Sequence, residues 1–153
     1  MTIFSRLPVL AAVLLAGAVS ACTTIRELPP DPADAELSIE QAEEREYSRK
    51  LLEAFLKNDA SGFIALLSPE MKEEFGKDKF TLSRKVITEE LGNPVSFSYV
   101  TALEHVAITP YIWKVRFVRK NKEDKEYYTE ALFRVLAGHD KDGNVIVVGF
   151  NFL

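Results

Sequence analysis

Cysteine and histidine are scarce in this 153-residue chain, which holds one Cys and two His. A single cysteine excludes an internal disulfide framework and any zinc or iron–sulfur site that needs several Cys ligands. His105 and His139 lie far apart in the sequence, so we predict no metal site and no cofactor. Basic residues form no long run and the net charge is −4, which argues against nucleic acid as a partner.

The chain also lacks an apolar run long enough to cross a membrane as a helix. The candidate, Leu7–Val19, follows a short start that carries Arg6. As a helix it spans roughly 20 Å, against a hydrocarbon core of about 30 Å. A positive charge, a short apolar stretch and then small residues is the order found in a secretory signal peptide.

The residues that end this segment, Val19-Ser20-Ala21-Cys22, resemble the bacterial lipobox, in which small residues precede a cysteine that becomes lipidated. The resemblance implies that residues 1–21 are a signal peptide and that Cys22 is the mature N-terminus, with lipid on its sulfur and its amine. An ordinary signal peptide, or an uncleaved anchor with a chance cysteine, is the alternative. Thr23 stands where lipoproteins of the inner membrane often carry Asp. We therefore expect an outer-membrane anchor with the domain facing the periplasm.

Residues 22–37 carry the lipidated cysteine and three prolines, and they contain almost no large apolar residue. Proline fixes φ and removes a hydrogen-bond donor, so the segment is predicted to be a semi-extended tether. Its reach is at most on the order of 45 Å. We expect it to hold a folded domain, residues 38–153, away from the membrane.

The folded part begins with helices. Tyr47, Leu51 and Phe55 recur at helical spacing and form one apolar stripe, while the charged residues beside them, Glu44 and Arg49 among others, are predicted to face solvent. Caps and glycines predict four helices: one that ends at Asn58-Asp59, one over Ala60–Leu67, one that starts at Ser68-Pro69-Glu70, and one over Lys79–Leu91 capped by Asp78.

From Val95 onward apolar and polar residues alternate, which predicts four consecutive strands. If Asn121–Lys125 is a turn, Trp113 lies opposite Phe133 on one face of the sheet, and opposite charges meet on the other face. The predicted charge pairs are Lys120 with Glu126 and Arg116 with Glu130. The basic stripe of Lys114, Arg116 and Lys120 is therefore predicted to be a solvated face with local ion pairs. The fold class is α+β, with N-terminal helices on an antiparallel sheet.

Several short motifs carry a resemblance to a known fold. They are Asn58-Asp59 after the first helix, Leu91-Gly92 before the first strand, and Asp142, Gly143, Val148, Gly149 and Phe150 along the last strand. Together they resemble the nuclear-transport-factor-2-like (cystatin-like) superfamily, although Val147 stands where relatives often carry Trp. The resemblance implies a cone of helices over a curved four-stranded sheet, with a pocket between them.

Pocket enzymes of that superfamily use an inward Asp, His or Tyr as acid or base. The residues predicted to face inward include Leu103 and His105 but no carboxylate, so His105 is the one candidate base and no enzyme is predicted. The candidate ligand-binding residues are Tyr99, His105, Trp113 and Tyr127. The segment from His139 to Asn144 superficially suggests a calcium loop, but it lacks the ligand spacing of an EF-hand and is predicted to be a hairpin turn.

Three functional classes remain open. A binder of a small apolar molecule predicts a cavity lined by Tyr99, Trp113 and Tyr127. A module for a protein partner or a homodimer predicts a filled cone and an apolar outer sheet face, for which the sequence supplies Ile112, Val118, Leu132 and Leu136. An isomerase- or dehydratase-type enzyme needs an inward acid–base pair. We expect a non-catalytic envelope lipoprotein that binds a small apolar molecule or a protein partner.

Overall fold

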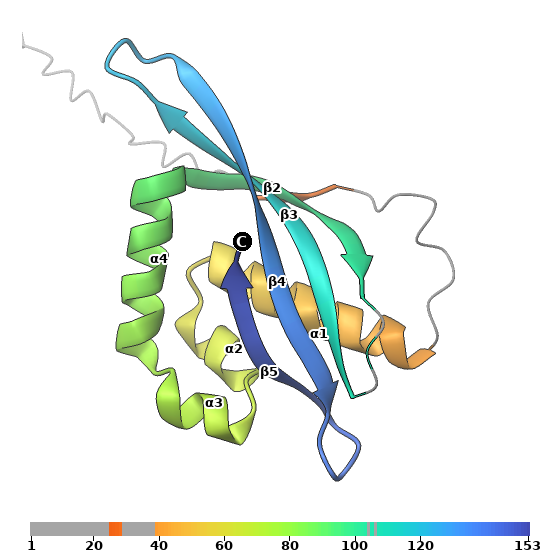
Figure 1. The fold of residues 1–153 in the computed structure, drawn as a ribbon. Coiled ribbons are helices and arrows are strands. Elements are labelled where there is room, and N and C mark those ends of the chain that lie inside the picture. The colour runs from red at the N-terminus through yellow and green to blue at the C-terminus, as the bar shows by residue number, and fades with distance from the viewer. Residues whose placement is uncertain (1–24, 29–38, 104, 106) are drawn as a thin grey trace, which may run out of the picture.

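The computed structural model describes residues 25–28, 39–103, 105 and 107–153, and its fold is α+β as predicted. The helices are α1 (Ile39–Leu56), α2 (Ala60–Ala65), α3 (Pro69–Glu74) and α4 (Lys77–Leu91). The strands are β1 (Arg26–Glu27), β2 (Asn93–Ala102), β3 (Ile108–Lys120), β4 (Glu126–His139) and β5 (Val145–Phe152). They form one sheet in the order β1-β2-β3-β4-β5, in which only β1 pairs in parallel. Figure 1 shows the sheet curving around α1.

Side-chain caps start the two short helices. Asp59 accepts a hydrogen bond from the Gly62 N–H at 2.9 Å, and Ser68 accepts one from the Met71 N–H at 3.3 Å. α4 differs from the prediction because it begins at Lys77 behind Gly76, which places Asp78 in its first turn rather than at its cap. A carboxylate in the first turn still favours the helix dipole. The predicted domain start at Ser38 lies outside the described residues.

The apolar stripe of α1 packs against the sheet and builds the core. Phe55 is at its centre, with ring centroids 5.6 to 6.1 Å from those of Phe63, Phe80, Phe133 and Phe152. Trp113, in the middle of β3, is 1% exposed. The prediction that Trp113 is a core residue is confirmed.

The predicted register of β3 against β4 is also confirmed. Lys120 pairs with Glu126, Arg116 with Glu130, and Trp113 with Phe133. On the outer face, Lys114 and Glu130 form an ion pair at 3.7 Å. The basic stripe is therefore a face with local ion pairs, as the alternation indicated.

The sheet gains a strand from the segment that the sequence predicted to be a tether. β1 pairs with the edge of β2, with Arg26 opposite Ser96 and Glu27 opposite Phe97. The Leu28 N–H donates to the Phe97 carbonyl at 2.7 Å, and Ile25 packs against the core. Residues 25–28 therefore belong to the domain. The strand could not be predicted from alternation, because it is two residues long and the side chains of Arg26 and Glu27 are both exposed.

Among the residues that the structure describes, no helix combines the length and the apolarity needed to cross a membrane. The signal-peptide segment and Cys22 lie outside those residues.

Candidate functional site

Two of the four predicted ligand-binding residues lie together. The Tyr99 and Trp113 rings have centroids 5.4 Å apart and line a cavity of about 370 Å³ between α1 and the β1–β2 edge. The other lining residues are charged: Glu27, Arg45, Glu46 and Arg49. Both rings are buried, so the exposed groups of this cavity are mainly charged ones.

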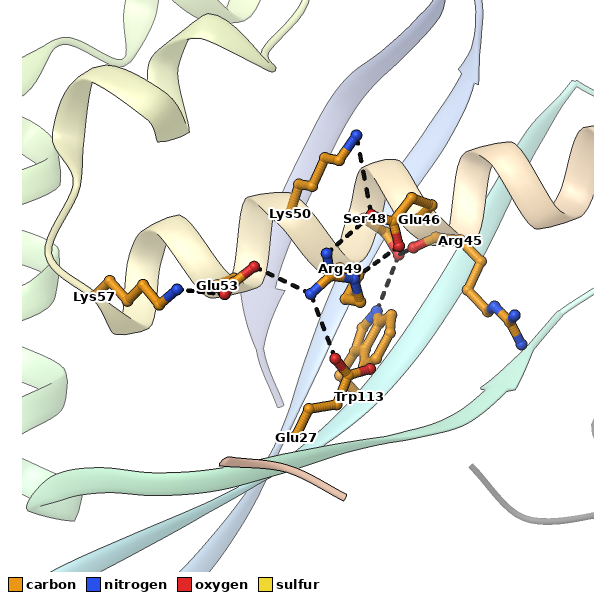
Figure 2. A network of polar contacts seen from close by, with 9 residues as sticks. All are labelled: Glu27, Arg45, Glu46, Ser48, Arg49, Lys50, Glu53, Lys57 and Trp113. Carbon is orange, nitrogen blue, oxygen red and sulfur yellow. Dashed lines mark hydrogen bonds and ion pairs between the residues drawn. The ribbon is translucent and has the colours of Figure 1, made fainter. Parts of the chain in front are cut away.

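Arg49 forms ion pairs with both acidic residues of this cavity, Glu27 and Glu46, as Figure 2 shows. Its guanidinium contacts Glu46 at 2.7 Å, Glu53 at 3.0 Å and Glu27 at 3.3 Å, so it joins two turns of α1 to β1. The hydrogen bond from Arg49 lowers the pKa of Glu46 below its usual value, and the one from Lys57 lowers the pKa of Glu53. Arg49 is thus engaged with the protein's own carboxylates, and the cluster is explained as a structural one.

The remaining predicted residues, His105 and Tyr127, lie elsewhere. The expectation that Leu103 and His105 face inward is wrong: β2 ends at Ala102, so the alternation stops before them and both are exposed. Tyr127 has the inward parity but is 54% exposed. It lies on the β3–β4 hairpin, which extends beyond the helices in Figure 1.

The structure places a carboxylate inside, which the sequence analysis did not predict. Glu44 is 6% exposed and accepts a hydrogen bond from the Tyr111 hydroxyl at 2.7 Å. Its other oxygen lies 3.2 Å from Nδ1 of His139. Burial raises the pKa of Tyr111, and the hydrogen bond to Glu44 raises it further.

Glu44 could have been found from helical spacing. It precedes Ser48, Leu51 and Phe55 by steps of four, three and four, so the buried stripe extends back to it. A buried acid beside a histidine resembles an acid–base pair, but Glu44 and His139 do not line the cavity beside Tyr99 and Trp113. Glu44, Tyr111 and His139 therefore tie the first turns of α1 to β3 and β4.

A largely apolar cavity lies between α4 and the sheet edge, and we call it the α4–β5 cleft. It has a volume of about 430 Å³ and is lined by Phe55, Leu82, Ser83, Val86, Ile87, Phe133, Phe150, Asn151 and Phe152. Leu82 is 62% exposed and Val86 is also exposed, so α4 presents apolar side chains at the cleft mouth. A solvent-exposed, largely apolar hollow of this kind marks an interaction site more often than a structural gap.

The outer sheet face does not collect its apolar residues into one patch. Ile112 is buried and lies opposite Arg134, while the exposed Leu132 lies opposite Lys114. Charged side chains thus interrupt the set that was predicted for a dimer or partner surface.

No cluster of three or more His, Cys, Asp or Glu side chains suited to a metal ion occurs in the described part of the chain. The segment from His139 to Asn144 forms the predicted hairpin turn. Asp140 Oδ1 accepts from the Asp142 and Asn144 N–H groups, each at 2.9 Å, and Gly143 takes a positive φ of 82°. The Asp140 carboxylate therefore stabilises the turn by accepting hydrogen bonds from its backbone.

No protein-family model and no curated protein sequence matches the chain, but solved structures match its fold. A ketosteroid isomerase-like protein from Erwinia carotovora atroseptica superposes with a TM-score of 0.55 at 14% identity, over 76% of this chain and 96% of its own. The fold is nuclear-transport-factor-2-like. The protein Aln2 from a Streptomyces species gives a TM-score of 0.51 at 10% identity, over 76% of this chain and 91% of its own.

The nuclear-transport-factor-2-like fold predicted from the short motifs is thereby confirmed. At these identities the likeness concerns the arrangement of helices and strands and says nothing of activity.

Proposed function

We propose that the chain is a non-catalytic, lipid-anchored envelope protein that holds a small apolar molecule in the α4–β5 cleft. The cleft carries the proposal, because it joins an apolar lining to an open mouth. Its volume of about 430 Å³ falls within the range of about 300–1,000 Å³ typical of small-molecule sites. The exposed Leu82 and Val86 would lose contact with water when a ligand enters.

The polar groups of the cleft limit what that molecule can be. Ser83 and Asn151 are its polar side chains. Asn151 is already engaged, since its Oδ1 accepts from Arg134 Nε at 2.9 Å and its Nδ2 donates to the Phe152 carbonyl at 3.1 Å. A ligand therefore finds few free partners for polar groups and many aromatic contacts, which favours a mainly apolar compound.

The placement of the acid–base groups supports binding over catalysis. Glu44 contacts His139 and Tyr111 and does not line the cleft, and His105 is exposed in the β2–β3 connection. A general base must lie within hydrogen-bond reach of the substrate, or reach it through one water. None of these groups lines the cleft.

Binding is tested with the fluorescent probe N-phenyl-1-naphthylamine, titrated into the mature protein. We expect saturable binding that weakens roughly tenfold in Val86→Gln, since about 1.4 kcal/mol of apolar contact is removed. Lys85→Gln, a neighbouring exposed position on α4, is the matched control and should bind as the parent does. Equal affinities of the two variants would overturn the proposal.

The lipid anchor rests on Val19-Ser20-Ala21-Cys22 and on Thr23 for the outer membrane. Two or three acyl chains give stable membrane attachment, which one chain does not. We expect Cys22→Ser to remain as a precursor that lacks lipid. Mass spectrometry of the N-terminal peptide and fractionation of inner and outer membranes test this. Normal processing and outer-membrane retention of the variant would contradict it.

A further inference from the structure

The direction of β1 shows at which end of the sheet the described chain enters the domain. β1 runs parallel to β2, so its N-terminal end points to the start of β2, where Asn93 pairs with Val118 of β3. The next strand across places Tyr128 opposite Val118. The chain therefore enters the domain at the end of the sheet that carries the β3–β4 hairpin (Figure 1).

The distance from this entry point to Cys22 is short. Thr23 and Thr24 alone separate Cys22 from Ile25, and three residue steps span at most about 11 Å. The Pro-rich stretch follows β1 and joins it to α1, so it adds nothing to the reach of the anchor. The long tether predicted from the sequence therefore does not separate the lipid from the sheet.

Side chains suited to a lipid surface are exposed at the same end. Tyr127 and Tyr128 are 54% and 51% exposed, on opposite faces of β4. The basic residues near them are Arg119, Lys120, Lys122 and Lys125, of which Lys120 pairs with Asp124 and Lys125 with Glu123, each at 3.1 Å. Tyrosine is enriched at membrane–water interfaces, and Lys and Arg are attracted to anionic headgroups.

We infer that the β3–β4 hairpin end of the sheet rests on the phospholipid surface in which the anchor is embedded, with Tyr127 and Tyr128 at the headgroups. This inference depends on the proposed lipidation of Cys22. The α4–β5 cleft and the domain then take a fixed orientation to the bilayer instead of moving freely on a tether.

Spin labels on the lipidated mature protein test the orientation. In that protein the Cys22 sulfur is held in a thioether, so an introduced cysteine is the one free thiol. Lys122→Cys places a label on the β3–β4 hairpin, and Asp142→Cys is the matched control on the β4–β5 turn, at the other end of β4. The probe is a water-soluble nickel chelate, with the protein in phosphatidylethanolamine–phosphatidylglycerol vesicles.

We expect the vesicles to protect the label at 122 from the chelate, while the label at 142 stays as accessible as in detergent. Equal accessibility at both positions in protein that floats with the vesicles would overturn the orientation. Protein that fails to float would instead overturn the lipid anchor, so the two failures are distinct. Replacing Tyr127 and Tyr128 by Ser should reduce protection at 122 without releasing the protein, and unchanged protection would refute the role of the tyrosines.

Discussion

Replacing Glu44 by alanine tests whether the buried carboxylate holds α1 on the sheet. The side chain is almost fully buried and has two contacts, the Tyr111 hydroxyl at 2.7 Å and His139 Nδ1 at 3.2 Å. A hydrogen bond to a charged acceptor contributes about 1.5–3 kcal/mol. The His139 contact adds little, because that imidazole is partly exposed and solvent screens the pair.

A second acceptor for the Tyr111 hydroxyl limits the loss of stability in Glu44→Ala. The Tyr111 hydroxyl also lies 3.1 Å from the Gln41 carbonyl, so it keeps a partner when the carboxylate is removed. We therefore expect Glu44→Ala to lower the free energy of unfolding by about 2 kcal/mol, a large fraction of the 5–15 kcal/mol typical of a domain. Glu43→Ala, on the exposed side of the same turn, should change it by less than about 0.5 kcal/mol.

Urea unfolding of these two variants, of Tyr111→Phe and of Glu44→Ala combined with Tyr111→Phe gives the free energies that a double-mutant cycle needs. A coupling energy of about 1 kcal/mol or more between Glu44 and Tyr111 would show that they act as a pair. If Glu44→Ala unfolds like Glu43→Ala, the contact contributes nothing and the structural explanation is refuted. If Glu44→Gln keeps its stability yet abolishes function in the cell, Glu44 acts in chemistry and the enzyme class gains support.

Three further changes have expected outcomes. Trp113→Ala should lower the free energy of unfolding by about 3–5 kcal/mol, because the ring is buried and its Nε1 donates to Ser48 Oγ at 3.0 Å; quencher-accessible native tryptophan fluorescence would contradict this packing. His105→Gln should change stability by less than about 0.5 kcal/mol and leave probe binding intact, since the side chain is exposed. Arg49→Gln should raise the pKa of Glu46 towards its ordinary value. The lowered pKa of Glu46 stabilises the fold above about pH 4.3, and this stabilisation is lost as pH falls through the folded-state pKa. The variant should therefore lose less stability than the parent on acidification. An equal loss would contradict the prediction.

Alternation and helical spacing predicted the parts of the fold in which one face is buried throughout. The register of β3 on β4 follows from the pairing of Arg116 with Glu130 and of Trp113 with Phe133, since a slip of one residue would reverse the faces. The same reasoning failed for Glu44, because a charged residue was assigned to solvent by its type although its position extends the buried stripe. The position of Glu44 on the helix decides its burial, and the hydrogen bond that it accepts from Tyr111 lowers the cost of burying the carboxylate.

Contacts between segments distant in the sequence were not predictable in this way. β1 is held by backbone pairing, by Ile25 and by the ion pair between Glu27 and Arg49, and none of these leaves a periodic signal. The α4–β5 cleft lies between Phe150 and Phe152 of the last strand and Leu82 and Val86 of α4, whose side chains leave the space between them open. That incomplete closure depends on how far α4 lies from the sheet, which the spacing of apolar residues does not specify.

Tyr127 shows why the parity of a strand residue and its exposure are separate questions. Its parity is inward, on the same face of β4 as Phe133, yet none of the described helices reaches the hairpin to cover it (Figure 1). Covering the hairpin would have needed a longer α4 or α1. A strand pair that extends past its helices exposes both faces, and Tyr127 on one face with Tyr128 on the other leaves aromatic surface on each. Exposed residues of this kind add nothing to the core, and the proposed contact with the membrane would account for their exposure.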